Sequence, residues 1–310
     1  MLKAVVFASL FAVSSIVMAL GSNSASWTAD AVCMMRAIAS ENPDPKLRNP
    51  DSLAAQLCPR PNDFRDYASA RERIDVFPEF YAGYFYVNAR TKYIDGVLRH
   101  AAESGIEQVV ILGAGFDSRA YRLHDNYPTL RFFEVDLPAM TALKKQRLRD
   151  ARIQIPGQVT LASIDFETQA LEDVLPAAGY NAAKKSLFIL EGVSMYISEA
   201  STGTSLEFVH RHAASGSSIV YDYVLRDILS ESRSRYYGME FNAETAAFHG
   251  EPYVTGWMPA EAAGFVRSHG LNVIEDLGPD ALAERFLIGS TGKPDGRPLE
   301  GFRIMQASVP

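Results

Sequence analysis

The sequence has little cysteine, no cluster of basic residues and no internal repeat, and these absences exclude several classes of protein. Its two cysteines, Cys33 and Cys58, stand in no C-x-x-C motif and beside no histidine pair, so we expect two free thiols rather than a zinc site or a disulfide framework. The net charge is −7 and lysine and arginine do not gather along one segment, which argues against nucleic acid as a partner. With 47% hydrophobic and 22% charged residues among 310, the chain is expected to be globular, with one or two domains.

The first 25 residues differ in composition from the rest. Lys3 is followed by an apolar stretch over residues 4–20 and then by small polar residues, which is typical of a secretory signal or a short membrane anchor. The stretch is slightly shorter than the roughly 20 residues that a spanning helix needs, so an apolar helix packed in the protein is the alternative. We therefore predict a signal or anchor over residues 1–25, membrane contact through residues 4–20, and one domain over residues 26–310.

Residues 42–63 and the chain beyond Tyr81 differ in pattern. Residues 42–63 are dense in Pro, Asn and Asp, which predicts an extended cover over the core or, alternatively, a linker. From Tyr81 onward, short apolar runs alternate with longer helical patterns, which indicates a parallel sheet with crossover helices.

Seven strands and five helices can be placed in this second part. The predicted strands are residues 109–112, 131–135, 159–163, 186–190, 218–224, 271–277 and 302–309. The predicted helices are residues 91–104, 137–151, 168–178, 198–214 and 259–269. We therefore predict an α/β fold whose seven-stranded, mostly parallel, Rossmann-like sheet carries helices on both faces and ends in an antiparallel pair. Residues 226–256 are too many for a plain connection, and we expect them to cover the carboxyl edge of the sheet as a lid.

The turn after the first predicted strand contains two glycines, Gly113 and Gly115. They let the backbone turn sharply and approach a ligand at the carboxyl edge, where open parallel sheets bind ligands. Ser118 stands where a dinucleotide-binding fingerprint has its third glycine, which weakens the prediction of a nicotinamide cofactor. A tight turn without a ligand is the alternative.

Carboxylates follow the next two strands at the same edge. Asp136 lies about 20 residues beyond the glycines, where an acid accepts hydrogen bonds from ribose hydroxyls, and Glu134 points the same way along the strand, so both are candidates to line one cleft. Asp165 and Phe166 follow the third strand, where they suit an adenine amino group and ring. Helix capping is the alternative for both aspartates.

Glu191 ends the fourth predicted strand after a run of apolar residues. Its burial is costly unless a cation meets it. A ligand with a ribose, an adenine and a positively charged end satisfies all these residues, and S-adenosylmethionine is such a ligand. Arg90 would then bind the ligand's carboxylate as a two-pronged donor, the alternative being a surface ion pair with Asp95 or Glu103.

Eight segments between Ser26 and the C-terminus have a distinctive order and spacing. They are TADAVCMMRAIAS, NPDPKLRNPDSLAAQL, NARTKYID, ILGAGFDSRAYRL, FFEVDLP, SIDF, ILEGVSMYI and GEPYVTGWMPAEAAGFVRSHGLNVIEDLGP. Together they resemble the leucine carboxyl methyltransferase family, especially its bacterial S-adenosylmethionine-dependent branch. The resemblance implies a class I methyltransferase fold of seven strands. It also implies cofactor contacts at Arg90, Gly113, Asp136, Asp165 with Phe166, and Glu191.

The resemblance predicts an O-methyltransferase whose acceptor is a carboxylate or hydroxyl of a small molecule or peptide. No residue is assigned as catalytic, since a carboxylate acceptor needs no base. For a hydroxyl acceptor the candidate bases are Asp222, Tyr196, Tyr223 and His249. Ordinary packing in the lid or core is the alternative for the two tyrosines and the histidine, and it is the preferred one. Cofactor supply favours a cytoplasmic location, whereas the apolar N-terminal segment favours anchoring or export. A nicotinamide-dependent oxidoreductase and a non-catalytic binding protein on the same fold are the alternatives.

Overall fold

Seven strands form one sheet in the order β3-β2-β1-β4-β5-β7-β6. The computed structural model describes residues 26–58, 64–165 and 168–310. The strands are β1 Gln108–Leu112, β2 Arg131–Asp136, β3 Val159–Ser163, β4 Ser186–Leu190, β5 Ser218–Val224, β6 Asn272–Leu277 and β7 Phe302–Ser308. The first five are parallel, and β7 pairs antiparallel with both β5 and β6. The predicted α/β class, the seven strands and the antiparallel end of the sheet are therefore confirmed.

The central strands are apolar along their whole length because helices cover both faces of the sheet. Every residue of β1 and β4 is buried, and Val110 pairs with Phe133 on one side and Phe188 on the other. One face packs against α5 Ala82–Glu103, α7 Pro138–Asp150 and α12 Pro279–Phe286, and the opposite face against α8 Leu171–Ala177, α9 Glu199–His212 and α11 Pro259–Ser268. The five predicted helices are all present, although the first begins at Ala82 rather than at residue 91.

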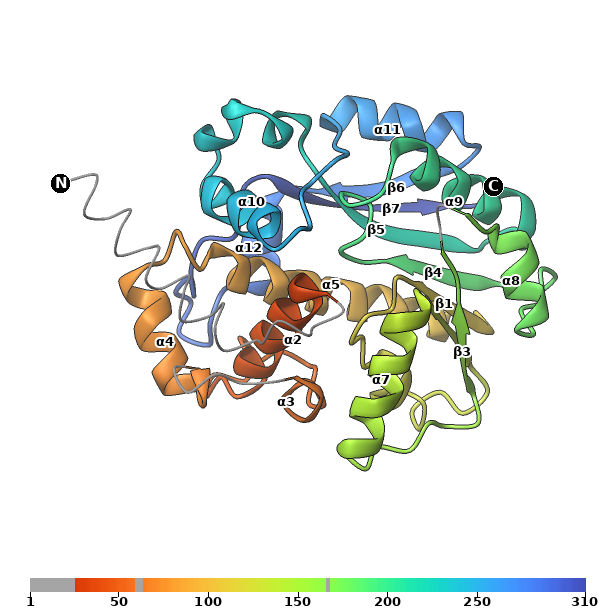
Figure 1. Ribbon diagram of the computed structural model, residues 1–310, viewed down its shortest axis with the longest axis horizontal. Helices are drawn as coiled ribbons and strands as arrows, with labels where there is room; N and C mark the ends of the chain where they lie inside the picture. The colour runs from red at the N-terminus through yellow and green to blue at the C-terminus, as the bar shows by residue number, and fades with distance from the viewer. Residues whose placement is uncertain (1–25, 59–63, 166–167) are drawn as a thin grey trace.

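A group of helices that the sequence pattern did not predict lies beside α5 (Figure 1). It consists of α2 Trp27–Ser40, α3 Ala54–Leu57, α4 Tyr67–Val76 and α10 Met239–Phe248. Residues 42–58 do cover the core, but they contain α3 and are not simply extended. Residues 226–256 form two short 3-10 turns, η2 Arg226–Leu229 and η3 Glu231–Arg235, and then α10.

Cys33 and Cys58 form a disulfide, so the prediction of two free thiols is wrong. Cys33 lies in α2, and the chain turns back after this helix so that Cys58, directly after α3, comes to face it with 5.9 Å between the Cα atoms. The Asn49 amide donates a hydrogen bond to the Ala39 carbonyl, which holds the chain after α2 against the end of that helix, and the Cys58 amide bonds the Ala54 carbonyl at the end of α3. The spacing of the two cysteines in the sequence could not show this pairing, because the turn that brings the two thiols together lies within the 25 residues that separate them.

The structure also corrects the prediction of a membrane-anchored protein. In residues 26–58, 64–165 and 168–310, no helix combines the length and the apolar character needed to cross a membrane. The predicted anchor or signal, over residues 1–25, lies outside the described residues.

Candidate functional site

A cavity of about 640 Å³ lies at the carboxyl ends of β1, β2 and β4, and continues between α2, α5 and α10. Six of the predicted binding residues line it, namely Arg90, Gly113, Gly115, Asp136, Asp165 and Glu191. The remaining one, Phe166, lies outside the described residues. The fold thus brings to one cavity residues that are up to about a hundred positions apart in the sequence.

The turn after β1 needs glycine at its first position. Gly113 has a φ of +67° and Gly115 a φ of +41°, the left-handed region that other residues rarely adopt. A Cβ on Gly113 would lie 2.3 Å from Cγ2 of Val193, so a larger residue would displace the loop after β4. The absence of a Cβ at Gly113 therefore lets the backbone pack closely against the side chain of Val193.

Asp136 links the end of β2 by hydrogen bonds to the turn over residues 113–118, which we call the glycine turn. Its Oδ2 accepts a hydrogen bond from the Gly115 amide at 2.6 Å, and its Oδ1 accepts one from the Leu137 amide at 2.7 Å. Burial raises the pKa of Asp136, and the two amides oppose the rise. The helix that follows has Leu137 as its N-cap, with no side-chain capping bond, so Asp136 is not the cap of α7.

Glu134 does not join Asp136 in the large cavity. Its carboxylate is buried, lies 2.8 Å from Nζ of Lys144 on α7, and accepts a hydrogen bond from the Tyr121 hydroxyl at 2.8 Å. The two acids do line one small hollow together with Lys144, but the prediction fails for the large cavity, because α7 folds over β2 and supplies a lysine for Glu134.

Glu191 lies between two buried arginines. Its Oε2 accepts a hydrogen bond from Nη1 of Arg119 at 2.6 Å, and its Oε1 lies 2.9 Å from Nε of Arg90. Arg119, the first residue of α6 Arg119–Arg122, also binds Asp95 and Asp117. Burial raises the pKa of Glu191, but Arg119 and Arg90 outweigh burial and lower it to about 2. The cation that a buried Glu191 requires is therefore supplied by the protein.

Arg90 is a buried part of the same network. Only 4% of the residue is exposed, and its Nη1 donates to Oδ2 of Asp222 at 2.5 Å while its Nε faces Glu191. The alternative of a surface ion pair is therefore wrong. Asp222 and Glu191 use two of the guanidinium nitrogens, and the planar fork has a third, Nη2, with which to bind a carboxylate.

Glu191 gives the folded protein a specific dependence on pH. Its folded pKa of about 2 lies below the ordinary 4.5, so its ion pairs stabilise the fold above about pH 4.5, and this contribution is lost as the pH falls toward 2. We expect the stability deficit of Glu191→Gln relative to the parent to shrink between about pH 6 and pH 2.5, measured by denaturant unfolding. Glu103→Gln, at the exposed end of α5, serves as the control, and an equal deficit of Glu191→Gln at every pH would contradict the account.

Asp165 follows β3 and lines the cavity. Its backbone amide donates to Oε1 of Gln169 at 3.0 Å. Helix α8 begins only at Leu171, with Ala170 as its N-cap, so Asp165 does not stand at the start of that helix as the capping alternative requires.

Of the four candidate bases, only Tyr196 lines the cavity. Asp222 is fully buried and its carboxylate binds Arg90, the Tyr86 hydroxyl and the Gly192 amide. Tyr223 packs on the other face of the sheet, where its hydroxyl donates to Asp276 at 3.0 Å. His249 stacks on Trp27 with ring centroids 3.9 Å apart. Burial raises the pKa of Tyr196, so this tyrosine is a poor base in the unliganded protein.

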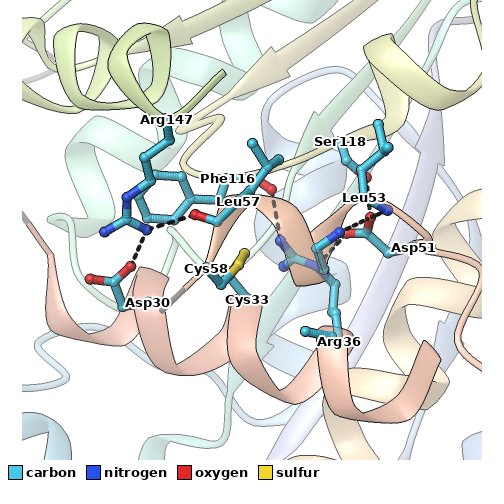
Figure 2. The surroundings of a disulfide bond; sticks show 12 residues. Asp30, Cys33, Arg36, Asp51, Leu53, Leu57, Cys58, Phe116, Ser118 and Arg147 are labelled. Carbon is cyan, nitrogen blue, oxygen red and sulfur yellow. Dashed lines mark hydrogen bonds and ion pairs between the residues drawn. A yellow bond between two sulfur atoms is a disulfide. The ribbon is translucent and has the colours of Figure 1, made fainter. Parts of the chain in front are cut away.

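Sequence reasoning missed a set of contacts that hold the glycine turn from the N-terminal helices. Figure 2 shows Arg36 of α2 between Asp51 and the turn. The arginine donates to Oδ2 of Asp51 at 2.8 Å and to the Phe116 carbonyl at 2.8 Å, and Ser118 also bonds Asp51. Ser118, which takes the place of the third fingerprint glycine, therefore fastens the turn to the N-terminal segment. A basic residue within the apolar pattern of TADAVCMMRAIAS was the signal available in the sequence.

Comparison with known proteins gives matches in both sequence and structure. A sequence model described as leucine carboxyl methyltransferase matches residues 29–210. YktD of Bacillus subtilis (strain 168), named as a candidate S-adenosyl-L-methionine-dependent methyltransferase, is 34% identical over 198 residues, or 64% of each chain. A similarly named Streptomyces coelicolor protein is 36% identical over 194 residues, which cover 61% of this chain and 66% of the relative. The alignments thus span just under two thirds of the length of these relatives.

A solved structure shares the fold. The crystal structure of a duf574 family protein from Streptomyces avermitilis superposes with a TM-score of 0.53 at 17% identity, and the match covers 79% of this chain and 92% of that one.

Proposed function

The chain belongs to the leucine carboxyl methyltransferase family, and from this premise we propose that it transfers a methyl group from S-adenosylmethionine to an oxygen atom of an acceptor, either a carboxylate or a hydroxyl. One observation carries the proposal: a single cavity at the carboxyl edge is lined by the glycine turn, Asp136, Asp165, Arg90 and Glu191. The family membership and the methyltransferase names of the relatives support it.

The cavity has the donors and acceptors that this cofactor requires. Asp136 and Asp165 are carboxylates that suit ribose hydroxyls and an adenine amino group, and Arg90 has a terminal nitrogen for the carboxylate of the methionine part. The two arginines lower the pKa of Glu191 and so keep it ionised, and its carboxylate adds negative charge near the methionine part of the cofactor. When bound, S-adenosylmethionine supplies a methyl group on a positively charged sulfur.

The residues around the cavity would act by alignment and by exclusion of water. The buried ion pairs fix Arg90 and Glu191 in one arrangement, and the bonds of Asp136 to Gly115 and of Arg36 to Phe116 fix the turn. Such preorganisation contributes to methyl transfer by holding the reacting atoms in line, and closure of the lid over bound ligands would limit the access of water.

Turnover is tested by incubating the full chain with methyl-labelled S-adenosylmethionine and a panel of carboxylate and phenolic acceptors. We expect label in an oxygen-methylated product together with an equal amount of S-adenosylhomocysteine. Label on nitrogen or carbon would overturn the choice of oxygen, whereas binding of the cofactor without turnover of any acceptor, including peptides, would favour a non-catalytic binding protein.

Residues 226–256 are expected to behave as a lid. The short turn η3 within them contains no buried residue and carries Arg233 and Arg235, whereas α10 contributes Phe241 and Thr245 to the cavity wall. We expect trypsin to cut the unliganded protein first at these arginines, and cofactor with acceptor to slow the cut, because a filled cavity adds contacts to α10. Cleavage at the same rate with and without ligands would count against a lid.

A further inference from the structure

The cavity has a second end, away from the predicted cofactor residues. We define the acceptor chamber as Met35, Phe80, Gly83, Phe241, Asn242 and Leu299, all of which line the cavity. A Cβ on Gly83 would lie 3.5 Å from Cε of Met35, 3.7 Å from Nδ2 of Asn242 and 3.8 Å from Cδ1 of Leu299, so these side chains converge on the glycine. The rings of Phe80 and Phe241, which line the same cavity, pack against each other with centroids 5.8 Å apart.

The helix α5 sets the distance between the two ends. Gly83 and Arg90 lie on this helix seven residues apart, which is close to two turns, so both face the cavity and are separated by about 10 Å along the helix axis. A ligand held by Arg90 at its charged end therefore leaves the acceptor chamber for a second molecule.

No described residue of the acceptor chamber carries a positive charge. Among the described residues that line the cavity, the only cationic side chains are Arg36 and Arg90, and both are engaged at the cofactor end. Arg36 binds Asp51 and the carbonyl of Phe116 in the glycine turn, and Arg90 binds Glu191 and Asp222. A carboxylate placed beside the phenylalanine rings would lose hydration and gain no counter-charge from these residues, which is unfavourable.

The chamber does suit an uncharged planar molecule. Phe80 and Phe241 present aromatic surface for stacking, and Met35 and Leu299 add apolar contact. The oxygen of the Asn242 amide accepts the Tyr253 hydroxyl at 2.5 Å, so its nitrogen is on the side of Gly83, where it offers N–H donors to an uncharged oxygen.

Resting on the proposed function, we propose that the acceptor is a neutral aromatic alcohol, that is, a phenol, and that the acceptor chamber selects it over the corresponding carboxylate. The acceptor oxygen forms a bond to the methyl carbon as the carbon–sulfur bond breaks. The electron pair of that bond stays on sulfur, which becomes a neutral thioether, and the proton of the hydroxyl goes to water.

The first test compares acceptors that share a ring system and differ in charge. The full chain is assayed with S-adenosylmethionine and either phenol and benzoate or 2-naphthol and 2-naphthoate, and cofactor binding is measured on the same preparation. We expect kcat/KM for the better phenol to exceed that for its carboxylate by at least about a hundredfold, because the anion is desolvated without a partner. Preference for a carboxylate, or cofactor binding without methylation of either phenol, would overturn the proposal, whereas a parent protein that binds no S-adenosylmethionine would refute the proposed function itself.

The second test fills the chamber. Gly83→Leu is expected to raise KM for the phenol at least about tenfold, and Gly83→Ala by less, while the Kd for S-adenosylmethionine changes by less than about twofold because Arg90 is two turns away. Gly96→Leu is the matched control, since it lies on the same helix, is exposed, and has open space around the position of its Cβ. Gly83→Ala adds only ordinary contacts and keeps the test valid if the leucine variant does not fold. An unchanged KM in the folded Gly83 variants would overturn the assignment of the chamber.

Discussion

Arg119→Met is expected to lower the free energy of unfolding by about 3–5 kcal/mol, because it removes a buried cation that three carboxylates share. The Arg119 side chain is 3% exposed and forms ion pairs with Asp95, Asp117 and Glu191. Methionine fills a similar volume, so the loss reports the charge rather than a void. Urea unfolding followed by circular dichroism measures the change.

Arg99→Gln is the matched control, because Arg99 also pairs with Asp95 but does so at the surface. Its side chain is 45% exposed and its Nη2 lies 3.4 Å from the carboxylate. Exposed pairs contribute little, so we expect a change of less than about 0.5 kcal/mol. If Arg119→Met changed the free energy of unfolding as little as this control, the buried ion pairs would not be what stabilises the part of the cavity lined by Arg90 and Glu191.

Asp136→Asn is expected to weaken binding of S-adenosylmethionine by about ten- to a hundredfold, since charge-assisted hydrogen bonds contribute roughly 1.5–3 kcal/mol. The variant keeps the shape of the side chain, and its one amide oxygen can still accept from the Gly115 amide, but its NH2 group cannot accept from the Leu137 amide. It also loses the negative charge that ribose hydroxyls would meet. Calorimetric titration gives the affinity, and thermal unfolding of the unliganded variant gives the stability.

Glu134→Gln is expected to show the opposite pattern. Glu134 is buried against Lys144 outside the large cavity, so its neutralisation leaves a buried ammonium without its partner while the cofactor site keeps its lining. Stability should therefore fall and cofactor affinity should hardly change. Equal cofactor affinity of Asp136→Asn and the parent would remove Asp136 from the site.

The fold could be predicted from the sequence because its sheet depends on local signals. Runs such as VVIL at 109–112 and SLFIL at 186–190 are apolar throughout, as buried parallel strands require, and they proved to lie within β1 and β4. The candidate binding residues followed from the same map, since residues after parallel strands meet at one edge of the sheet.

What the sequence did not predict depends on contacts between distant segments. Asp222 was a candidate base by its position on β5, but the burial of Arg90 beside it turns it into an ion-pair partner. Arg119 was not singled out, because its three carboxylate partners come from α5, the glycine turn and the end of β4. The same holds for Cys33 and Cys58, whose pairing follows from the return of the chain after α2.

The central claim is that the cavity at the carboxyl edge binds S-adenosylmethionine, and its most direct test is calorimetric titration of the parent protein with S-adenosylmethionine and, separately, with NAD. The account predicts saturable binding of one S-adenosylmethionine per chain and no binding of NAD, because Ser118 bonds Asp51 where a dinucleotide fingerprint has its third glycine. Saturable binding of NAD without binding of S-adenosylmethionine would contradict it.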